Sequence, residues 1–320
     1  LALRVNDREA VYPITIDPVS TSPNTLLTGP VLNQQYGLSV CTAGDLNGDG
    51  RSDVVIGAPY TLVGGGGNTG RVYVHYGTNS GITTVLSLVL NGPQAGGLYG
   101  SAVSTAGDVN GDGFSDLLIG ARSYESNVVT ENNEGIVFIH YGSSTGINTV
   151  PDQQLETDHA EDAIGSFLAC AGDINNDGFS DVLVSGYLAS YPSFNEGAVF
   201  VYMGSASGLN TVPLHRLERN QGGAFFGKSV AGAGDVNGDG YSDVIIGASK
   251  FVYTGGFSDQ GTAFIWFGSA AGLGPGINPA FDQQLYGSGS SVGYFGWSVT
   301  CAGDINGDGY SDVAVSGYIG

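Results

Sequence analysis

Residues 45–53 read DLNGDGRSD, and this nine-residue pattern decides the fold because it occurs five times in the chain. The other copies begin at positions 108, 173, 235 and 304, so successive copies start 62 to 69 residues apart. A repeat of this length is too long for a helix pair or a leucine-rich repeat and suits a four-stranded sheet with its loops. The pattern therefore predicts an array of small β-sheet units.

The sequence around each copy repeats as well. A run of small and apolar residues precedes the motif, as at residues 101–107, and a β-branched run follows it, as at residues 244–248. Each of the first four copies is followed by a third strand that leads into a Gly-x-x-x-Gly turn. We expect these third strands at residues 71–76, 136–141, 198–203 and 263–267, and more polar fourth strands at residues 85–90, 153–156, 214–218 and 281–285. No segment has a helical period.

Four antiparallel strands per repeat form a β-propeller when the sheets stack radially, because each sheet then buries its faces on its neighbours. A linear array of small calcium-bound modules would leave each set of strands without a second layer. The sequence therefore predicts an all-β chain, a β-propeller of four-stranded antiparallel blades.

The charge distribution indicates a metal and argues against nucleic acid. The chain has 320 residues with 9 basic and 30 acidic side chains, a net charge of −21, which opposes binding to a phosphate backbone. Hydrophobic residues make up 41% of the chain, enough for a folded core. Fifteen of the acids fall in the five motifs. No stretch is apolar enough to predict insertion into a membrane.

Each motif supplies oxygen ligands for a hard cation. Side chains at positions 1, 3 and 5 surround one side of the ion, Gly at position 6 permits the sharp turn, position 7 offers its carbonyl, and the Asp at position 9 closes the shell. Oxygen donors without His or Cys select Ca²⁺ over Zn²⁺ or copper, and this many protein oxygens disfavour Mg²⁺. A single such loop is also typical of an ordinary surface turn, but five in register are not. We expect about five structural Ca²⁺ ions.

The predicted calcium ligands are the residues at positions 1, 3, 5, 7 and 9 of the five loops. They are Asp45, Asn47, Asp49, Arg51, Asp53, Asp108, Asn110, Asp112, Phe114, Asp116, Asp173, Asn175, Asp177, Phe179, Asp181, Asp235, Asn237, Asp239, Tyr241, Asp243, Asp304, Asn306, Asp308, Tyr310 and Asp312. The third loop has Asn176 in place of Gly at position 4, which is not a ligand position.

Two further elements recur around the loops. An aromatic residue followed by Gly precedes the loops, at Tyr36-Gly37, Tyr99-Gly100, Phe226-Gly227 and Phe295-Gly296, and is altered to Ile164-Gly165 in the third repeat. A Gly-Ala-Pro element follows the first loop at residues 57–59 and drifts to GAR at 120–122, SGY at 185–187, GAS at 247–249 and SGY at 316–318. Over residues 31–320 the chain thus resembles FG-GAP repeats, the units of the integrin alpha-subunit β-propeller and of related bacterial surface proteins.

The resemblance leaves the number of blades open. The repeats span about residues 31–90, 91–156, 157–218, 219–286 and 287–320, and the last one lacks two strands. Residues 1–24 are expected to be the tail of a preceding module or a closing strand, although Pro13 interrupts the candidate strand at 10–16; residues 25–28 are the other candidate. Integrin-like propellers usually have seven blades, so we favour part of a seven-bladed propeller over a closed five-bladed one.

Outside the loops the chain contains no Ser-His-Asp, Cys-His or His-Glu-x-x-His constellation, which argues against an enzyme. His75 and His140 occupy a position that an aromatic residue fills in the next two repeats, which indicates packing. His159 lies in the acidic segment 152–162, where a solvated loop competes with a weak extra cation site. Tyrosines in the loops are candidates for ligand recognition: Tyr60, Tyr124, Tyr187, Tyr191, Tyr253 and Tyr318.

The first hypothesis for function is a calcium-binding, non-enzymatic propeller that serves as an extracellular adhesion or protein or glycan interaction domain. Millimolar extracellular calcium would fill such loops, so we expect a secreted or cell-surface protein, part of a larger multidomain chain, with no nucleic-acid partner. The alternatives are a substrate-binding or catalytic propeller of a secreted carbohydrate-active enzyme, and a propeller lectin.

Overall fold

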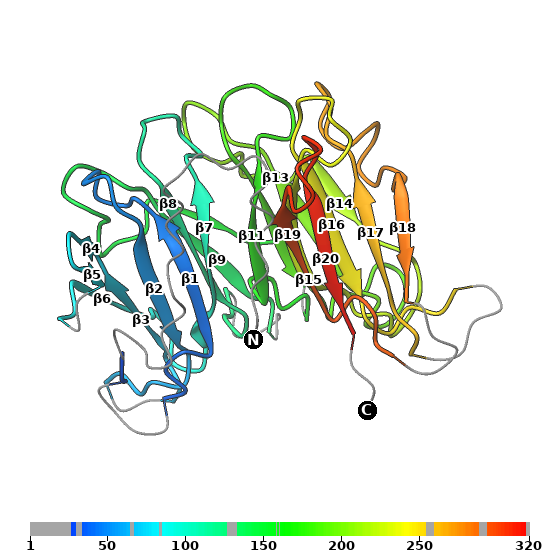
Figure 1. Cartoon of the computed structure of the whole chain (residues 1–320). Helices are drawn as coiled ribbons and strands as arrows, with labels where there is room; N and C mark the ends of the chain where they lie inside the picture. Colours follow the sequence, from blue (N-terminus) through cyan, green and yellow to red (C-terminus); the bar gives the residue numbers. More distant parts are fainter. Residues whose placement is uncertain are drawn as a thin grey trace, which may run out of the picture.

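The computed structural model describes residues 27–29, 34–64, 67–82, 85–126, 133–157, 159, 161–253, 259–287 and 293–317. Within these ranges every regular element is a β-strand, and the prediction of an all-β chain is confirmed (Figure 1). The same ranges contain no helix that is long and apolar enough to cross a membrane.

The strands form four antiparallel sheets of four strands, a fifth sheet of two, and one separate two-stranded hairpin. The first sheet contains β1 (Ser39–Gly44), β2 (Asp53–Ala58), β3 (Arg71–His75) and β6 (Leu88–Asn91), with the small hairpin β4 (Gly77–Thr78) and β5 (Gly81–Ile82) between β3 and β6. The second contains β7 (Tyr99–Gly107), β8 (Asp116–Ala121), β9 (Ile136–His140) and β10 (Gln153–Leu155).

The remaining sheets follow the same order. The third contains β11 (Phe167–Gly172), β12 (Asp181–Gly186), β13 (Ala198–Tyr202) and β14 (His215–Leu217). The fourth contains β15 (Phe226–Gly234), β16 (Asp243–Ala248), β17 (Thr262–Trp266) and β18 (Gln283–Tyr286), and the fifth contains β19 (Ser298–Gly303) and β20 (Asp312–Ser316). The predicted third strands agree with these bounds to within one residue, and the fourth strands to within three.

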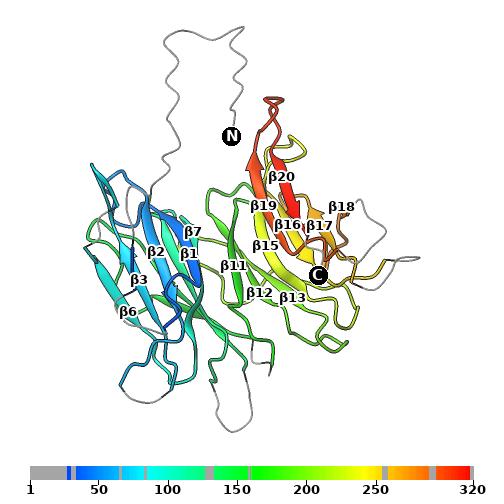
Figure 2. The same ribbon diagram turned by 60° about the horizontal axis from the view of Figure 1, so that its bottom comes forward.

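The sheets stand side by side around a common axis like blades, with the first strand of each sheet innermost (Figure 2). A cavity of about 500 Å³ lies on this axis and is lined by residues of β1, β7, β11, β15 and β19. The hydrophobic core is divided into clusters, one between each pair of neighbouring sheets; between the first two, Val72 and Val74 pack with Leu117 and Ile119. Each blade therefore obtains its core from its neighbours.

The arc of sheets does not close among the described residues. The innermost strands pack on one another in the order β1, β7, β11, β15 and β19, whereas β1 and β19 stand apart (Figure 2). One position of the repeated loop shows that the outer face of the fifth sheet is uncovered. The apolar residue at position 2 of the loop is fully buried as Leu46, Val109 and Ile174, whereas Ile305 in the fifth loop is 73% exposed because no further sheet covers it. The candidate closing segment 10–16 lies outside the described residues, and residues 27 and 28 are not in a strand.

The residue two positions before each third strand bonds to the next blade through its backbone. Tyr99, Ile164, Phe226 and Phe295, which begin the aromatic-Gly element or its variant, donate their N–H groups to the carbonyl oxygens of Thr69, Glu134, Glu196 and Gln260 over 2.8–3.1 Å. All four acceptor residues are buried. These bonds fix the position of each blade relative to the next along the common axis.

The aromatic-Gly element varies together with the end of the third strand. The hydroxyls of Tyr36 and Tyr99 lie 3.3 and 3.2 Å from Nε2 of His75 and His140. In the fourth blade Phe226 packs edge-on against Trp266 at 6.0 Å instead. Both histidines are buried, so the prediction that they have a packing role is confirmed.

The first Gly of the Gly-Ala-Pro element meets the Gly of the next blade's aromatic-Gly element. A Cβ atom on Gly57, Gly120 or Gly247 would lie 2.0–2.1 Å from the carbonyl oxygen of Gly100, Gly165 or Gly296. In the third blade Ser185 takes this place, and its hydroxyl donates to the Gly227 carbonyl over 2.6 Å. The drift from Gly to Ser therefore replaces a close backbone contact by a hydrogen bond.

We expect Gly120→Ala to destabilise the protein by about 1–3 kcal/mol, because the added methyl group overlaps the Gly165 carbonyl and forces two blades apart. Gly222→Ala is the control, since its nearest neighbour would be 3.3 Å from the new Cβ, and its cost should stay within about 0.5 kcal/mol. Urea unfolding followed by fluorescence measures both. Equal midpoints for the two variants would contradict this account of the interface.

Candidate metal centre

The five acidic loops connect the first and second strands of the five sheets. Because the sheets share one strand order and stand side by side, all five loops lie at the same end of the stack. Each loop follows a Gly in the left-handed region, such as Gly107 with φ of 75°. The repeated sequence is therefore one repeated structure.

Inside each loop the side-chain oxygens at positions 1 and 3 converge on one backbone N–H. In the second loop the N–H of Asp112 points at Asp108 Oδ1 and Asn110 Oδ1, 3.1 and 3.0 Å away, and Gly113 N–H donates to Asp108 Oδ2 over 2.8 Å. The N–H of Phe114 then donates to Asp112 Oδ1 over 3.0 Å. The other four loops repeat these contacts within 0.2 Å.

The Asp at position 9 has a second role that we did not predict. Asp116 is fully buried, and its two carboxylate oxygens accept N–H groups from Val109, inside the loop, and from Gly142, the first Gly of the Gly-x-x-x-Gly turn, each over 2.9 Å. Asp53, Asp181 and Asp243 make the same pair of bonds, to Gly77, Gly204 and Gly268 on the turn side. The two recurring motifs were visible in the sequence, but their bond to each other was not.

This burial places a charge where water cannot solvate it. Loss of hydration raises the pKa of Asp116 and Asp181 to about 7 and that of Asp243 to about 6, and the carboxylates at positions 5 and 1 of the same loop add to the rise. Ionisation of these groups is therefore costly in the protein alone. A cation held by the loop would lower that cost, because it would offset the neighbouring negative charges.

The side-chain oxygens of each loop suit a hard cation, although they do not bring three carboxylates together around one point. In the part of the chain that the structure describes, no three His, Cys, Asp or Glu side chains come together as a metal cluster. One physical reason is that position 3 is an amide and position 9 already binds two N–H groups. In the second, fourth and fifth loops Oδ1 of the position-1 Asp already accepts two N–H groups. Its Oδ2 and the side-chain oxygens at positions 3 and 5 accept one bond each and keep a free lone pair, so they offer oxygen ligands of the type that Ca²⁺ prefers.

The loops are also joined from blade to blade. The N–H of the Ser at position 8 donates to the position-1 carbonyl of the preceding loop in four places, from Ser115 to Asp45, Ser180 to Asp108, Ser242 to Asp173 and Ser311 to Asp235, over 2.8–3.1 Å. The aromatic ring at position 7 packs on the Gly at position 4 of the preceding loop, as Phe114 does on Gly48. Order in one loop therefore supports the next.

Arg51 makes the first loop different. Its Nη1 donates to the Asp49 carbonyl over 2.9 Å and lies 3.5 Å from Asp49 Oδ2. The other loops have Phe or Tyr at this position. A metal in the first loop would share Asp49 with this guanidinium, and the two positive charges would repel each other. We therefore expect charge repulsion to affect the metal affinity of the first loop more than that of the other four.

The acidic segment 152–162 is exposed at Asp152, Glu156 and Glu161, as a solvated segment would be, but not at Asp162. Asp162 is fully buried, and its carboxylate accepts hydrogen bonds from the Tyr191 hydroxyl over 2.5 Å and from Thr157 over 3.0 Å. His159 Nδ1 lies 2.8 Å from the other oxygen. The prediction of a solvated segment is therefore wrong for Asp162, since the third blade folds over it.

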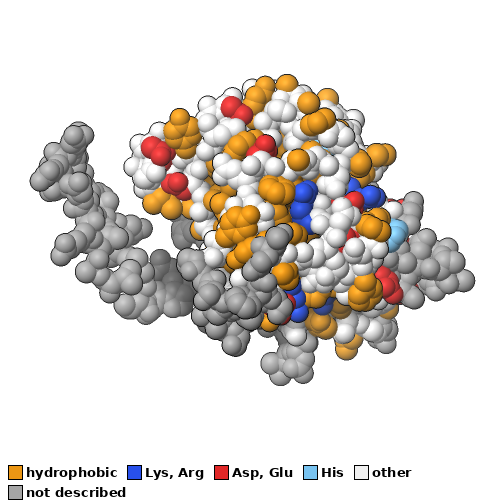
Figure 3. All heavy atoms as spheres, turned by 90° about the vertical axis from the view of Figure 1, so that its right-hand side faces the viewer, with side chains coloured by type: hydrophobic (Ala, Val, Ile, Leu, Met, Phe, Trp, Pro, Cys, Tyr) orange, Lys and Arg blue, Asp and Glu red, His pale blue; other side chains and the backbone are white. Residues whose placement is uncertain are grey.

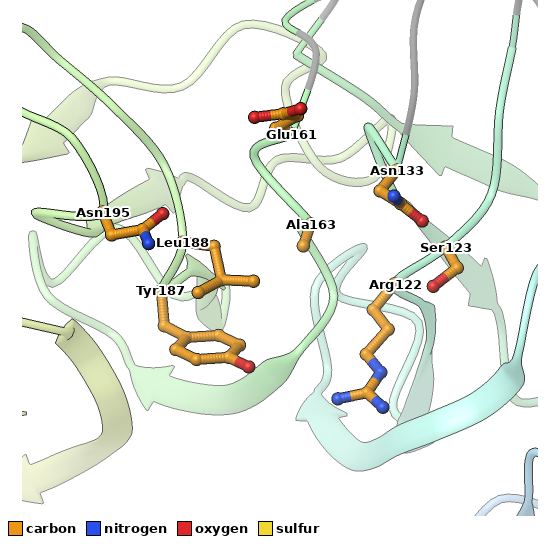
Figure 4. Close-up of a pocket in the computed structure, with 8 residues that line it drawn as sticks. All are labelled: Arg122, Ser123, Asn133, Glu161, Ala163, Tyr187, Leu188 and Asn195. Atoms are coloured by element: carbon orange, nitrogen blue, oxygen red, sulfur yellow. The ribbon is translucent and has the colours of Figure 1, made fainter.

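The tyrosines proposed for recognition have different surroundings. Tyr124 packs edge-on against Phe138, and Tyr191 stacks near His159. Tyr187 lines a cavity of about 360 Å³ between the second and third blades, opposite Arg122 (Figure 4). Because Arg122 and Tyr187 follow the second strands, this cavity lies at the end of the sheets opposite to the acidic loops. Tyr318 is outside the described residues.

Comparison with known proteins agrees with these repeats. The FG-GAP repeat family matches residues 36–75, 99–140, 226–266 and 295–318. The third repeat, where Ile164 and Ser185 alter both signature elements, is not among the matched ranges. The chain is therefore an FG-GAP repeat protein.

Its relatives are integrin alpha subunits. The chain is 35% identical over 200 residues to Integrin alpha-4 of Xenopus laevis, a match that covers 61% of this chain and 18% of that protein. It is 31% identical over 234 residues to Integrin alpha-5 of Xenopus laevis, covering 69% and 21%, and 32% identical over 226 residues to Integrin alpha-V of Gallus gallus, covering 64% and 19%. The matches thus span about a fifth of the length of these relatives.

We expect Asp116→Asn to lower the free energy of unfolding by about 2 kcal/mol in the presence of chelator, because an amide can accept only one of the two buried N–H groups and turns a donor toward the other. Asp312→Asn is the matched control. Asp312 is only half-buried and accepts the N–H of Ile305 over 2.8 Å, a bond that Asn can keep. Its cost should stay within about 0.5 kcal/mol. Chemical unfolding in excess chelator measures both, and equal costs would contradict the double role of position 9.

Proposed function

We propose that the chain is a calcium-binding, non-enzymatic β-propeller domain that serves extracellular adhesion or the binding of a protein or glycan. The observation that carries the proposal is the identical arrangement of side-chain oxygens in five loops at one end of the stack. A hard divalent cation is the partner that such oxygen donors suit. The relationship to integrin alpha subunits supports the adhesion role.

The proposed ligands of each ion are the residues at positions 1, 3, 5, 7 and 9 of its loop. Side chains would bind from positions 1, 3 and 5, and the carbonyl from position 7. Position 9 would contribute a lone pair of a carboxylate oxygen whose hydrogen bonds already fix its place. We take the ions to be structural, because the loops also carry the contacts between blades.

Localisation and domain context follow from the same proposal. Loops of this kind bind calcium at the millimolar levels found outside cells, so we infer a secreted or cell-surface protein. Residues 25–320 would form the propeller portion, within a larger multidomain chain, and residues 1–24 would belong to a preceding module or to a closing strand. The partner would be an extracellular protein or glycan.

Calorimetric titration of Ca²⁺ into chelator-stripped protein tests the proposal. We expect up to five equivalents to bind, and a thermal midpoint that rises with free calcium, since each site adds about 2.7 kcal/mol of stability at a hundredfold excess over its dissociation constant. Binding without a rise in the midpoint would refute the structural role. No binding at millimolar calcium would refute the metal sites themselves.

A double variant locates the ions. Asp108→Asn with Asp112→Asn should remove one equivalent and leave the others, because it withdraws two carboxylates from the second loop only. Glu125→Gln with Glu161→Gln removes the same charge outside the loops and should leave the stoichiometry unchanged. An equal loss in both variants would mean that the bound calcium is a diffuse counterion layer around a chain of charge −21.

A further inference from the structure

A groove of about 670 Å³ runs along the outer side of the fourth blade. Its walls come from three separate parts of the chain: Arg219 before β15, Phe251 and Tyr253 after β16, and Phe281 and Tyr286 at the two ends of the β18 segment. Figure 3 shows the side of the molecule on which β17 and β18 lie, where basic and hydrophobic side chains are neighbours. None of these residues belongs to an acidic loop.

The base of the groove is a guanidinium surrounded by aromatic rings. The Cζ atom of Arg219 lies 4.9 Å from the centre of the Trp266 ring, 5.3 Å from that of Phe281 and 5.6 Å from that of Phe264. Nη2 donates to Asn278 Oδ1 over 3.3 Å and to the Pro279 carbonyl over 3.4 Å, while Nε is buried and has no hydrogen-bond partner among the described residues. Burial lowers the pKa of Arg219 to about 10, so the group stays charged at neutral pH.

Arg219 forms no ion pair with any of the described residues, although the charge of the adjacent Glu218 favours its charged form. Within the described ranges no carboxylate lies within ion-pair distance of it, and the neighbouring Glu218 pairs with Arg216, 3.3 Å away. In a chain with 30 acidic and 9 basic side chains, an unpaired cation at the base of a groove is a site that selects anions.

The wall of the groove is held in place before any ligand arrives. The amide of Gln221 brackets Val252, accepting its N–H over 2.6 Å and donating to its carbonyl over 2.8 Å. The N–H of Lys250 donates to the Ala224 carbonyl over 3.1 Å. Tyr253 packs edge-on against Tyr286 at 4.9 Å, and Tyr286 is 53% exposed. A ligand would therefore meet a preformed aromatic wall, with little entropy lost on binding.

We propose that this groove binds a saccharide that carries a carboxylate, a sugar acid of the uronate or sialate class. The carboxylate would accept hydrogen bonds from Arg219, and the apolar face of the sugar ring would pack on Tyr286 and Phe281. The side-chain amide of Gln284, which lines the groove, and the tyrosine hydroxyls would bind the ring hydroxyls. The site goes beyond the proposed function and does not depend on the calcium loops.

Calorimetry and saturation-transfer NMR on the calcium-saturated chain test this with digalacturonate, glucuronate and N-acetylneuraminate. We expect at least one acid to bind, and the dimethyl ester of digalacturonate, which keeps the rings but not the charge, to bind at least about tenfold more weakly than digalacturonate if that is the acid bound. If glucuronate or N-acetylneuraminate is the acid that binds, its methyl ester provides the same comparison. Equal affinity of acid and ester would overturn the role of Arg219. Binding of none of the acids would overturn the proposal.

Variants assign the binding to the groove. Tyr286→Ala should weaken binding about fivefold through loss of the stacked ring, and Arg219→Gln about tenfold or more, while Arg219→Lys should recover part of the loss. Because Arg219 also packs in the core, Tyr286→Ala and Gln284→Ala test the groove even where Arg219→Gln fails to fold. Phe194→Ala, an exposed ring outside the groove, is the control and should bind as the parent does.

The peptide acetyl-Phe-Asp-amide separates a glycan site from a protein site, because it offers an aromatic ring and a carboxylate without a sugar. Binding of this peptide, lost in Tyr286→Ala, together with no binding of the acidic sugars, would overturn the saccharide proposal. A chain that binds calcium with a rising midpoint but none of the sugars would overturn the groove alone and leave the proposed function intact.

Discussion

The buried Asp at the end of each of the first four acidic loops makes the interaction on which the rest of the structure depends. Its two oxygens hold the start of the loop and the Gly after the third strand at once, so one carboxylate fixes the relative positions of three strands. That geometry requires a negative charge in a place with little water, beside two other carboxylates. A cation in the loop would relieve this repulsion. Calcium binding and the geometry of the blade would then depend on the same carboxylates.

The second constraint is that no blade is complete alone. The core lies between sheets, and the Ser at position 8 bonds back to the preceding loop. The aromatic-Gly element bonds back to the residue two positions before the third strand of the preceding blade. Stability in such a stack is close to a sum of contacts between nearest neighbours. The fifth loop shows the consequence, because Ile305 is exposed where Leu46, Val109 and Ile174 are covered.

The fold could be predicted from the sequence because its two periodic signals, the acidic loop and the Gly-x-x-x-Gly turn, recur once per blade. The bond between them could not, since nothing in the spacing says that Asp116 accepts the N–H of Gly142. The reason for the altered sequence of the third repeat could be seen only in its contact with the next blade, where the Ser185 hydroxyl donates to the Gly227 carbonyl. Buried Asp162 was missed because an acidic stretch normally indicates a solvated surface.

The residues that repeat and those that do not lie at different places in the stack. Loops between first and second strands keep one sequence, because each must fit both its own blade and the next. The segments around β18 and after β16 carry no such double constraint. There the chain places Tyr253, which has an equivalent in Tyr191 of the third blade, next to Arg219 and Tyr286. Selection for stability accounts for what recurs. A residue that departs from the repeat without removing a contact between blades can therefore bind a ligand at one blade and not at its neighbours. The groove of the fourth blade is such a place.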